Sequence, residues 1–166
     1  MHDILKHRRG DWPRAAIDVL ASVSGFGSVI VRSASQDSAA GIRWEEILRA
    51  ELSASAVKKG TVPLVRGLLG YSVDALPQAH AIFQEEHGFL GSYCHGMMHR
   101  REGDFWNANY WFRSAGKPPA GLFARGFEPE RLTSACESAA RGGDEPQVLE
   151  ALALEAAQIL DHVFGG

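Results

Sequence analysis

The sequence of 166 residues contains only two cysteines, no long apolar run and no marked excess of either charge. Cys94 and Cys136 are too few for a disulfide framework and form no Cys-x-x-Cys pair, so we expect reduced, partly buried thiols in a cytoplasmic protein. A membrane-spanning helix needs about 20 mostly apolar residues, and Asp18, Glu150 and Glu155 interrupt the most apolar segments. The sequence therefore predicts no membrane partner and no secretory signal.

The charge balance argues against a nucleic-acid partner. Lys and Arg number 17 against 20 Asp and Glu, which gives a formal charge of −3. Proteins that bind nucleic acid usually carry a concentrated basic patch, and the basic clusters at 6–9 and 99–101 are short. We therefore predict no nucleic-acid partner.

Common catalytic templates are also missing from the sequence. The chain has neither a glycine-rich phosphate loop with a lysine nor a Gly-x-Ser-x-Gly elbow.

What the sequence does contain is helical periodicity. A chain of this length can bury enough surface for one core, and 45% of its residues are apolar. We therefore predict a single all-α domain over residues 1–166. Asp11 and Asp144 are the expected N-caps of the first and last of the flanking helices. The flanking helices are expected at 11–23, 42–59, 129–141 and 146–164, with a loop at 24–41.

The middle of the chain repeats itself. Residues 64–83 align without a gap on residues 93–112, at a spacing of 29 residues. Each copy has the pattern of a helix, a turn near Asp74 or Gly103, and a second helix. We predict two tandem antiparallel helical hairpins of repeat type across about residues 61–116. The matched positions include Gly67 and Gly96, Ala79 and Ala108, and Phe83 and Phe112.

The second copy, Gly103-Asp104-Phe105-x-x-Ala108-x-x-x-Phe112-x-x-Ala115, resembles the second half of a tetratricopeptide repeat. The resemblance covers about residues 64–118 and implies stacked helical hairpins in which small residues allow close approach. The spacing of 29 residues is shorter than the usual period of about 34, and His95 and His99 replace the usual Leu and Tyr. The string HRREGD-x-x-NA-x-YWF, residues 99–112, also resembles uncharacterised bacterial proteins. This second resemblance brings no known activity with it.

A histidine pair in the second copy suggests a metal site. On a helix over 91–102, His95, His99 and Glu102 lie at i, i+4 and i+7 and share one face. Imidazole and carboxylate groups are ligands for zinc, iron or nickel, and His80 in the preceding hairpin is the expected further ligand. Gly96 occupies the position of the glutamate in H-E-x-x-H, so the metalloprotease motif is absent. The alternatives are a metal-dependent enzyme or histidines that are simply packed and hydrogen-bonded.

The main functional prediction is a polar pocket for a small anionic ligand or a peptide. Adjacent arginines can bind a carboxylate or phosphate through two hydrogen bonds each, although arginines also suit a helix C-terminus and Asp104 suits an N-cap. Replacing both arginines with Met is then expected to abolish ligand binding without loss of stability. The predicted pocket residues are His95, His99, Arg100, Arg101, Asn107, Asn109, Tyr110 and Arg113.

The helix expected at 105–115 has an unusual outer face. Trp106, Asn109, Tyr110 and Arg113 share it, whereas a solvated helix usually carries Glu, Lys and Gln there. We expect this face to be covered by another part of the chain, by a ligand or by a second subunit, so a homodimer interface is a further interpretation. Cys94 next to His95 points in a different direction on a helix, which argues against a Cys–His catalytic pair.

Overall fold

A computed structural model describes residues 3–23, 25, 26, 28–31, 38–49 and 60–165. Within these residues the regular secondary structure is entirely helical, which confirms the all-α class. No helix among them is long and apolar enough to cross a membrane. The helices are α1 (Asp3–Lys6), α2 (Arg14–Ala21), α3 (Ser38–Arg49), α4 (Val62–Ser72), α5 (Leu76–Phe83), α6 (Gly88–Glu102), α7 (Phe105–Ala115), α8 (Pro129–Ala139) and α9 (Glu145–Phe164).

The N-terminal third differs most from the prediction. The short helix α1 was not expected, and α2 begins after Pro13 with no side-chain cap, so Asp11 is not its N-cap. Helix α3 begins at Ser38, inside the segment predicted to be a loop. The predicted continuation of that helix over 50–59 lies outside the described residues. Helix α2 begins without a capping side chain, which is why the sequence placed its start poorly.

The central helices occupy the positions that the internal similarity predicts. Helix α4 packs on α5, and α6 packs on α7 along most of its length. A Cβ on Gly67 would lie 2.5 Å from the ring of Phe83, and a Cβ on Gly96 would lie 2.8 Å from the ring of Phe112. Both glycines therefore admit a phenylalanine from the following helix. The tandem arrangement of repeat-type hairpins and the tetratricopeptide resemblance stay predictions.

Two aspartates cap their helices as expected. The side chain of Asp104 accepts a hydrogen bond from the backbone N–H of Asn107 at the start of α7, at 3.2 Å. Asp144 accepts one from Gln147 at the start of α9, also at 3.2 Å. Gly103, with φ of 83°, ends α6 in the left-handed region that favours glycine. The turn from α6 to α7 is thereby fixed by residues visible in the sequence.

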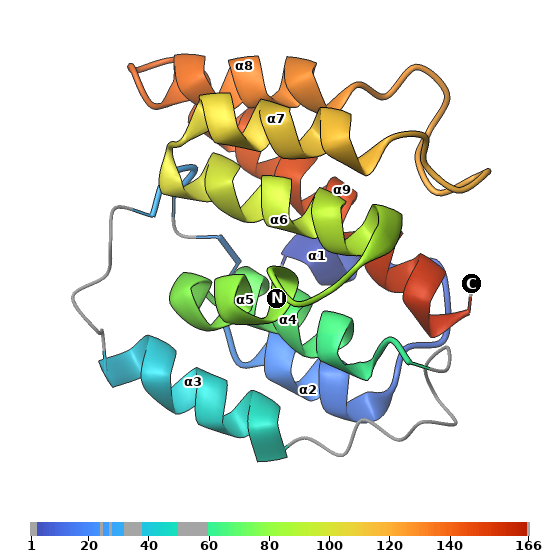
Figure 1. Ribbon diagram of the computed structural model, residues 1–166. Helices are drawn as coiled ribbons and strands as arrows, with labels where there is room; N and C mark the ends of the chain where they lie inside the picture. Colours follow the sequence, from blue (N-terminus) through green and yellow to red (C-terminus); the bar gives the residue numbers. More distant parts are fainter. Residues whose placement is uncertain (1–2, 24, 27, 32–37, 50–59, 166) are drawn as a thin grey trace.

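Figure 1 shows how the helices are layered. Helices α6, α7 and α8 lie side by side, α2 and α3 lie at the opposite end of the molecule, and α4 and α5 lie between them. The long helix α9 contacts α1, α4 and α8, so it joins the layers. Near the end of α9, Asp161 accepts hydrogen bonds from the backbone of Arg9 and Gly10 and from the Trp12 indole. Contacts to α9 thus hold the N-terminal segment.

Candidate metal centre

Three histidines from two neighbouring helices meet at one point. His80 lies on α5, and His95 and His99 lie one turn apart on α6, which packs against α5. One ring nitrogen of each histidine can be chosen so that all three lie within 4.8 Å of one another. Glu102, one turn further along α6, completes the group. The structure therefore brings together all four residues predicted as metal ligands.

The shortest contact joins the first two histidines. His95 Nε2 and His80 Nε2 are 3.1 Å apart, which in the absence of an ion is a hydrogen bond between two imidazoles. Glu102 contacts the other two rings, with Oε2 3.2 Å from Nδ1 of His99 and Oε1 3.9 Å from Nδ1 of His80. The rings are thus already turned toward one another and toward one carboxylate.

Burial favours the uncharged form of His80 and His95. The pKa of His95 is lowered to about 4, mainly by burial and also by the neighbouring rings of His99 and His80, while Glu102 opposes this effect. Burial also lowers the pKa of His80, although Glu102 opposes this effect. A neutral imidazole keeps a lone pair on one ring nitrogen. Near neutral pH these two residues are therefore in the form that a metal ion requires.

Helix α7 covers one side of the histidine group. The indole of Trp111 stacks on His95 with ring centroids 4.2 Å apart and planes 18° from parallel. The side-chain nitrogen of Asn107 lies 3.2 Å from Nε2 of His99. On the other side the group opens to solvent, because the side chains of His80 and Glu102 are 34% and 35% exposed. The histidine group is thus covered by α7 on one side and partly exposed on the other.

The two predicted arginines are buried and paired with carboxylates of the same chain. Arg100 Nη2 donates to Glu155 Oε2, and the other oxygen of Glu155 accepts a 2.6 Å hydrogen bond from the Tyr93 hydroxyl. Burial opposes the Arg100 charge, but Glu155 holds the pKa of Arg100 above its ordinary value. Arg100 also lies over the ring of Phe112. Its strongest contacts therefore join α6 to α9 inside the core.

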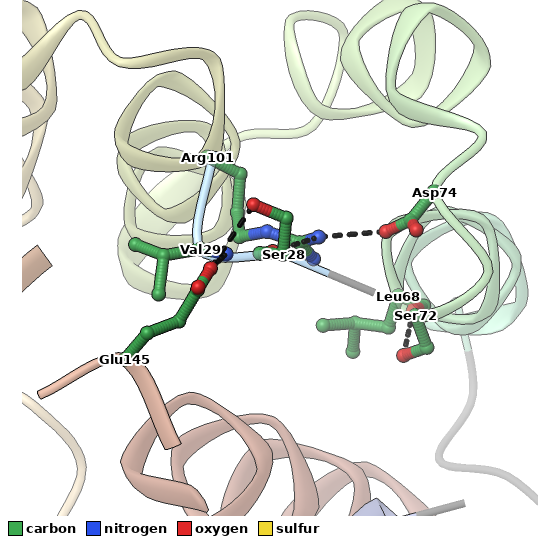
Figure 2. Close-up of polar contacts among 7 residues, drawn as sticks. All are labelled: Ser28, Val29, Leu68, Ser72, Asp74, Arg101 and Glu145. Carbon is green, nitrogen blue, oxygen red and sulfur yellow. Dashed lines mark hydrogen bonds and ion pairs between the residues drawn. The ribbon is translucent and has the colours of Figure 1, made fainter. Parts of the chain in front are cut away.

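Arg101 joins a different set of elements, drawn in Figure 2. Its Nη2 donates to the carbonyl of Ser28 at 3.0 Å and to Oδ1 of Asp74 at 2.6 Å. Its guanidinium carbon lies 4.4 Å from the ring centroid of Phe26. Glu145 holds the same segment from the other side, by accepting from the Ser28 hydroxyl and from the Val29 backbone N–H. Arg101 is completely buried and does not reach solvent.

The remaining predicted ligand-binding residues lie on α7 and do not join the arginines. Tyr110 is 50% exposed and stacks with Trp106, which is 75% exposed. Arg113 is exposed, and Asn109 is partly buried with an unpartnered Oδ1. The expectation that the rest of the chain covers this face is wrong for the described residues, because Trp106 and Tyr110 stay open to solvent. The eight predicted residues are therefore distributed over the histidine group, the buried ion pairs and the outer side of α7.

Two important residues were not singled out from the sequence. Glu155 lies among Leu152, Ala156 and Ile159 on the buried face of α9, and a lone carboxylate on an apolar helical face was a usable signal for a buried cation. Trp111 was not among the predicted site residues. Its stacking on His95 depends on how α7 crosses α6, which the sequence does not state.

Comparison with known proteins gives no relative. The chain matches no family model, no curated protein and no solved structure. The geometry of the histidine group therefore carries the functional argument alone.

Proposed function

We propose that this protein binds a divalent transition metal ion through His80, His95 and His99. The observation that carries the proposal is the convergence of three imidazoles, from two helices, within 4.8 Å. Three imidazoles this close together offer the ligand number typical of a catalytic zinc site. Two of them, His80 and His95, have lowered pKa values and are therefore neutral near pH 7. Zinc, iron and nickel all accept imidazole ligands.

The spacing suits such an ion. Two imidazole nitrogens bound to tetrahedral zinc, each at about 2.0–2.1 Å from it, lie roughly 3.3 Å apart. The 3.1 Å between Nε2 of His80 and Nε2 of His95 is close to that value. The third nitrogen lies further away, within the 4.8 Å limit of the group, so a modest side-chain rotation of His99 would close the set.

The partial exposure of the histidine group suits a metal site that catalyses a reaction. Catalytic zinc sites have three protein ligands and leave the fourth position for water or substrate. Here His80 and Glu102 are about one-third exposed, so small molecules can approach from their side. An ion there would polarise a substrate or lower the pKa of bound water. We therefore propose a metal-dependent enzyme as the finer form of the function.

The predicted pocket for an anionic ligand has less support. Its strongest anion-binding groups, Arg100 and Arg101, already pair with Glu155 and Asp74 and are buried. An anion would have to displace these carboxylates from the interior. The metal site needs no such rearrangement.

Titration of tag-free protein with zinc, followed by calorimetry and elemental analysis, tests the metal site. We expect one equivalent of zinc to bind. In the variants His80→Gln and His95→Gln the affinity should fall at least about 100-fold, equivalent to about 2.7 kcal/mol. His80 is the safer position for this test, because its partial exposure makes a folding defect less of a concern.

His87→Gln is the matched control. His87 is exposed and precedes α6 without a side-chain capping bond. Its variant should bind zinc as the unmodified protein does. The proposal fails if the unmodified protein binds less than a tenth of an equivalent of zinc, nickel and iron alike, or if His87→Gln loses as much affinity as His95→Gln. Far-UV circular dichroism of each variant separates lost binding from lost folding.

We also propose a cytoplasmic location. Both cysteines, Cys94 and Cys136, are buried and free. Burial raises the pKa of the Cys94 thiol well above its ordinary value, so that thiol is inert. Free buried thiols are typical of proteins in a reducing compartment.

A further inference from the structure

Glu102 meets the histidine group on one particular edge. Its two oxygens approach His99 and His80, and in both rings the nearer atom is Nδ1, at 3.2 Å and 3.9 Å. The carboxylate therefore lies on the side of each ring away from Nε2. This position differs from that expected of a fourth ligand that shares an ion with the Nε2 atoms.

The Nε2 atoms of the same two rings face other groups. Nε2 of His80 is 3.1 Å from Nε2 of His95. Nε2 of His99 is 3.2 Å from the side-chain nitrogen of Asn107, an amide that donates hydrogen bonds. A neutral imidazole that accepts at Nε2 carries its proton on Nδ1. His99 thus accepts from Asn107 at Nε2 and, when neutral, carries its proton on Nδ1, on the ring edge that faces Glu102. His80 shows the same edge to Glu102 at the longer distance of 3.9 Å.

We infer that Glu102 is a positioning residue that accepts Nδ1–H from His99 and so keeps the lone pair of this ring on Nε2, where an ion can replace the Asn107 contact. The inference rests on the proposed metal site and assigns Glu102 a role other than the ligand expected from the sequence. Carboxylates that orient metal-binding histidines in this way fix the ring tautomer and increase the basicity of the ligating nitrogen.

The contact between Glu102 and His99 is close but is not aligned as a hydrogen bond. Nδ1 of His99 is buried and lacks an aligned hydrogen-bond partner, although Glu102 Oε2 is only 3.2 Å away. The Glu102 side chain is about one-third exposed, so it can turn toward His99 without displacing packed atoms. Closing this contact gives His99 its only missing partner. It also fixes the proton of the ring on Nδ1 and leaves the lone pair on Nε2.

Zinc affinity of Glu102→Ala and Glu102→Gln tests the inference. Loss of an orienting carboxylate costs about 10–100-fold in metal affinity, and we expect a loss in this range for Glu102→Ala. Glu102→Gln should be intermediate, because its carbonyl oxygen can still accept one Nδ1–H. Glu85→Ala, an exposed carboxylate just after α5, should bind zinc unchanged.

Cobalt(II) substitution distinguishes a positioning residue from a ligand. If Glu102 only orients the ring of His99, the visible bands of the cobalt protein keep their position and intensity in Glu102→Ala once cobalt is saturating. A shift of these bands would show that an oxygen ligand has been lost and would overturn the inference. Equal zinc affinity of Glu102→Ala and the unmodified protein would overturn it as well.

Nitrogen-15 NMR of the histidine rings provides a readout that needs no metal. We expect the Nδ1–H tautomer for His99 in the unmodified protein and a mixture of tautomers in Glu102→Ala. Nε2–H on His99 of the unmodified protein would contradict the assigned role of Glu102. The two failures are distinguishable: absence of zinc binding defeats the metal proposal, whereas tight zinc binding with an unaffected Glu102→Ala defeats only the role of Glu102.

Discussion

Arg100 and Arg101 are adjacent in the chain yet hold different parts of the molecule. Arg100 pairs with Glu155 on α9, and Arg101 pairs with Asp74 in the turn between α4 and α5. The sequence suggested a shared anion site because two neighbouring cations exceed what a helix end needs. The partners are 55 and 27 residues away, and only the tertiary fold shows that they neutralise the arginines.

Substitution of Arg100 should therefore reduce stability. Arg100→Met leaves Glu155 buried with Tyr93 as its remaining hydrogen-bond donor. Removing one member of a buried ion pair typically costs about 3–5 kcal/mol, so we expect a loss of this size in urea unfolding. The double variant Arg100→Met/Glu155→Gln should recover part of it, because the uncompensated charge is gone. Unchanged stability in Arg100→Met would show that the pair is not structural.

The lowered pKa of His95 makes stability depend on pH. The folded protein holds this ring neutral down to about pH 4, whereas the unfolded chain binds a proton below its ordinary value of 6.5. Between these values the unfolded state binds more protons, so the free energy of unfolding falls as the pH falls from 6.5 toward 4. Each pKa unit is worth about 1.4 kcal/mol.

Urea unfolding of metal-free protein at pH 7 and pH 5 measures this effect. The unmodified protein should lose more stability between the two values than His95→Gln, which has no titrating ring. A parallel loss in both proteins would mean that other groups dominate the pH dependence.

At the scale of helices, the sequence was most reliable where a capping residue marks an end. Asp104, Gly103 and Asp144 place the ends of α6, α7 and α9 because each makes a local contact that its residue type favours. Helix α2 follows Pro13, whose side chain makes no such contact. Asp74 was placed in a turn from its neighbours, and its φ of 64° confirms that position.

The contact between Gly96 and Phe112 should be intolerant of added volume. A Cβ at Gly96 would also lie 3.1 Å from the carbonyl oxygen of Ala108, so α6 and α7 would have to separate. We expect Gly96→Ala to cost about 1–3 kcal/mol, measured by thermal and urea unfolding. Because the added methyl meets the Phe112 ring, Gly96→Ala/Phe112→Leu should cost less than the sum of the single changes. Strict additivity would show that the two residues do not share this space.

For the whole molecule, binding of an ion at α5 and α6 should stabilise the fold. An ion present at 100 times its dissociation constant adds about 2.7 kcal/mol, which for a chain of this size raises the melting temperature by roughly 5–10 °C. We expect this shift with zinc, its reversal by a chelator, and its absence in His95→Gln. A shift of equal size in His95→Gln would place the ion elsewhere.

The aromatic pair of Trp106 and Tyr110 lies on the molecular surface. Trp106→Ser/Tyr110→Ser should leave the unfolding free energy within about 0.5 kcal/mol of the unmodified protein, because both side chains are largely solvent-exposed. Light scattering at high micromolar concentration tests the interpretation of this face as a homodimer interface. A dimer that becomes monomeric in the double variant supports that interpretation, and a monomer in both cases counts against it.

The stacking of Trp111 on His95 gives the protein an internal optical sensor. An indole whose ring centroid lies 4.2 Å from that of an imidazole would lose fluorescence when a paramagnetic ion such as nickel or copper binds that imidazole. The other three tryptophans, Trp12, Trp44 and Trp106, do not stack on a histidine of this group and supply a constant background. The fluorescence lost on titration with the ion, and retained in Trp111→Phe, would then report occupancy of the histidine group without any label.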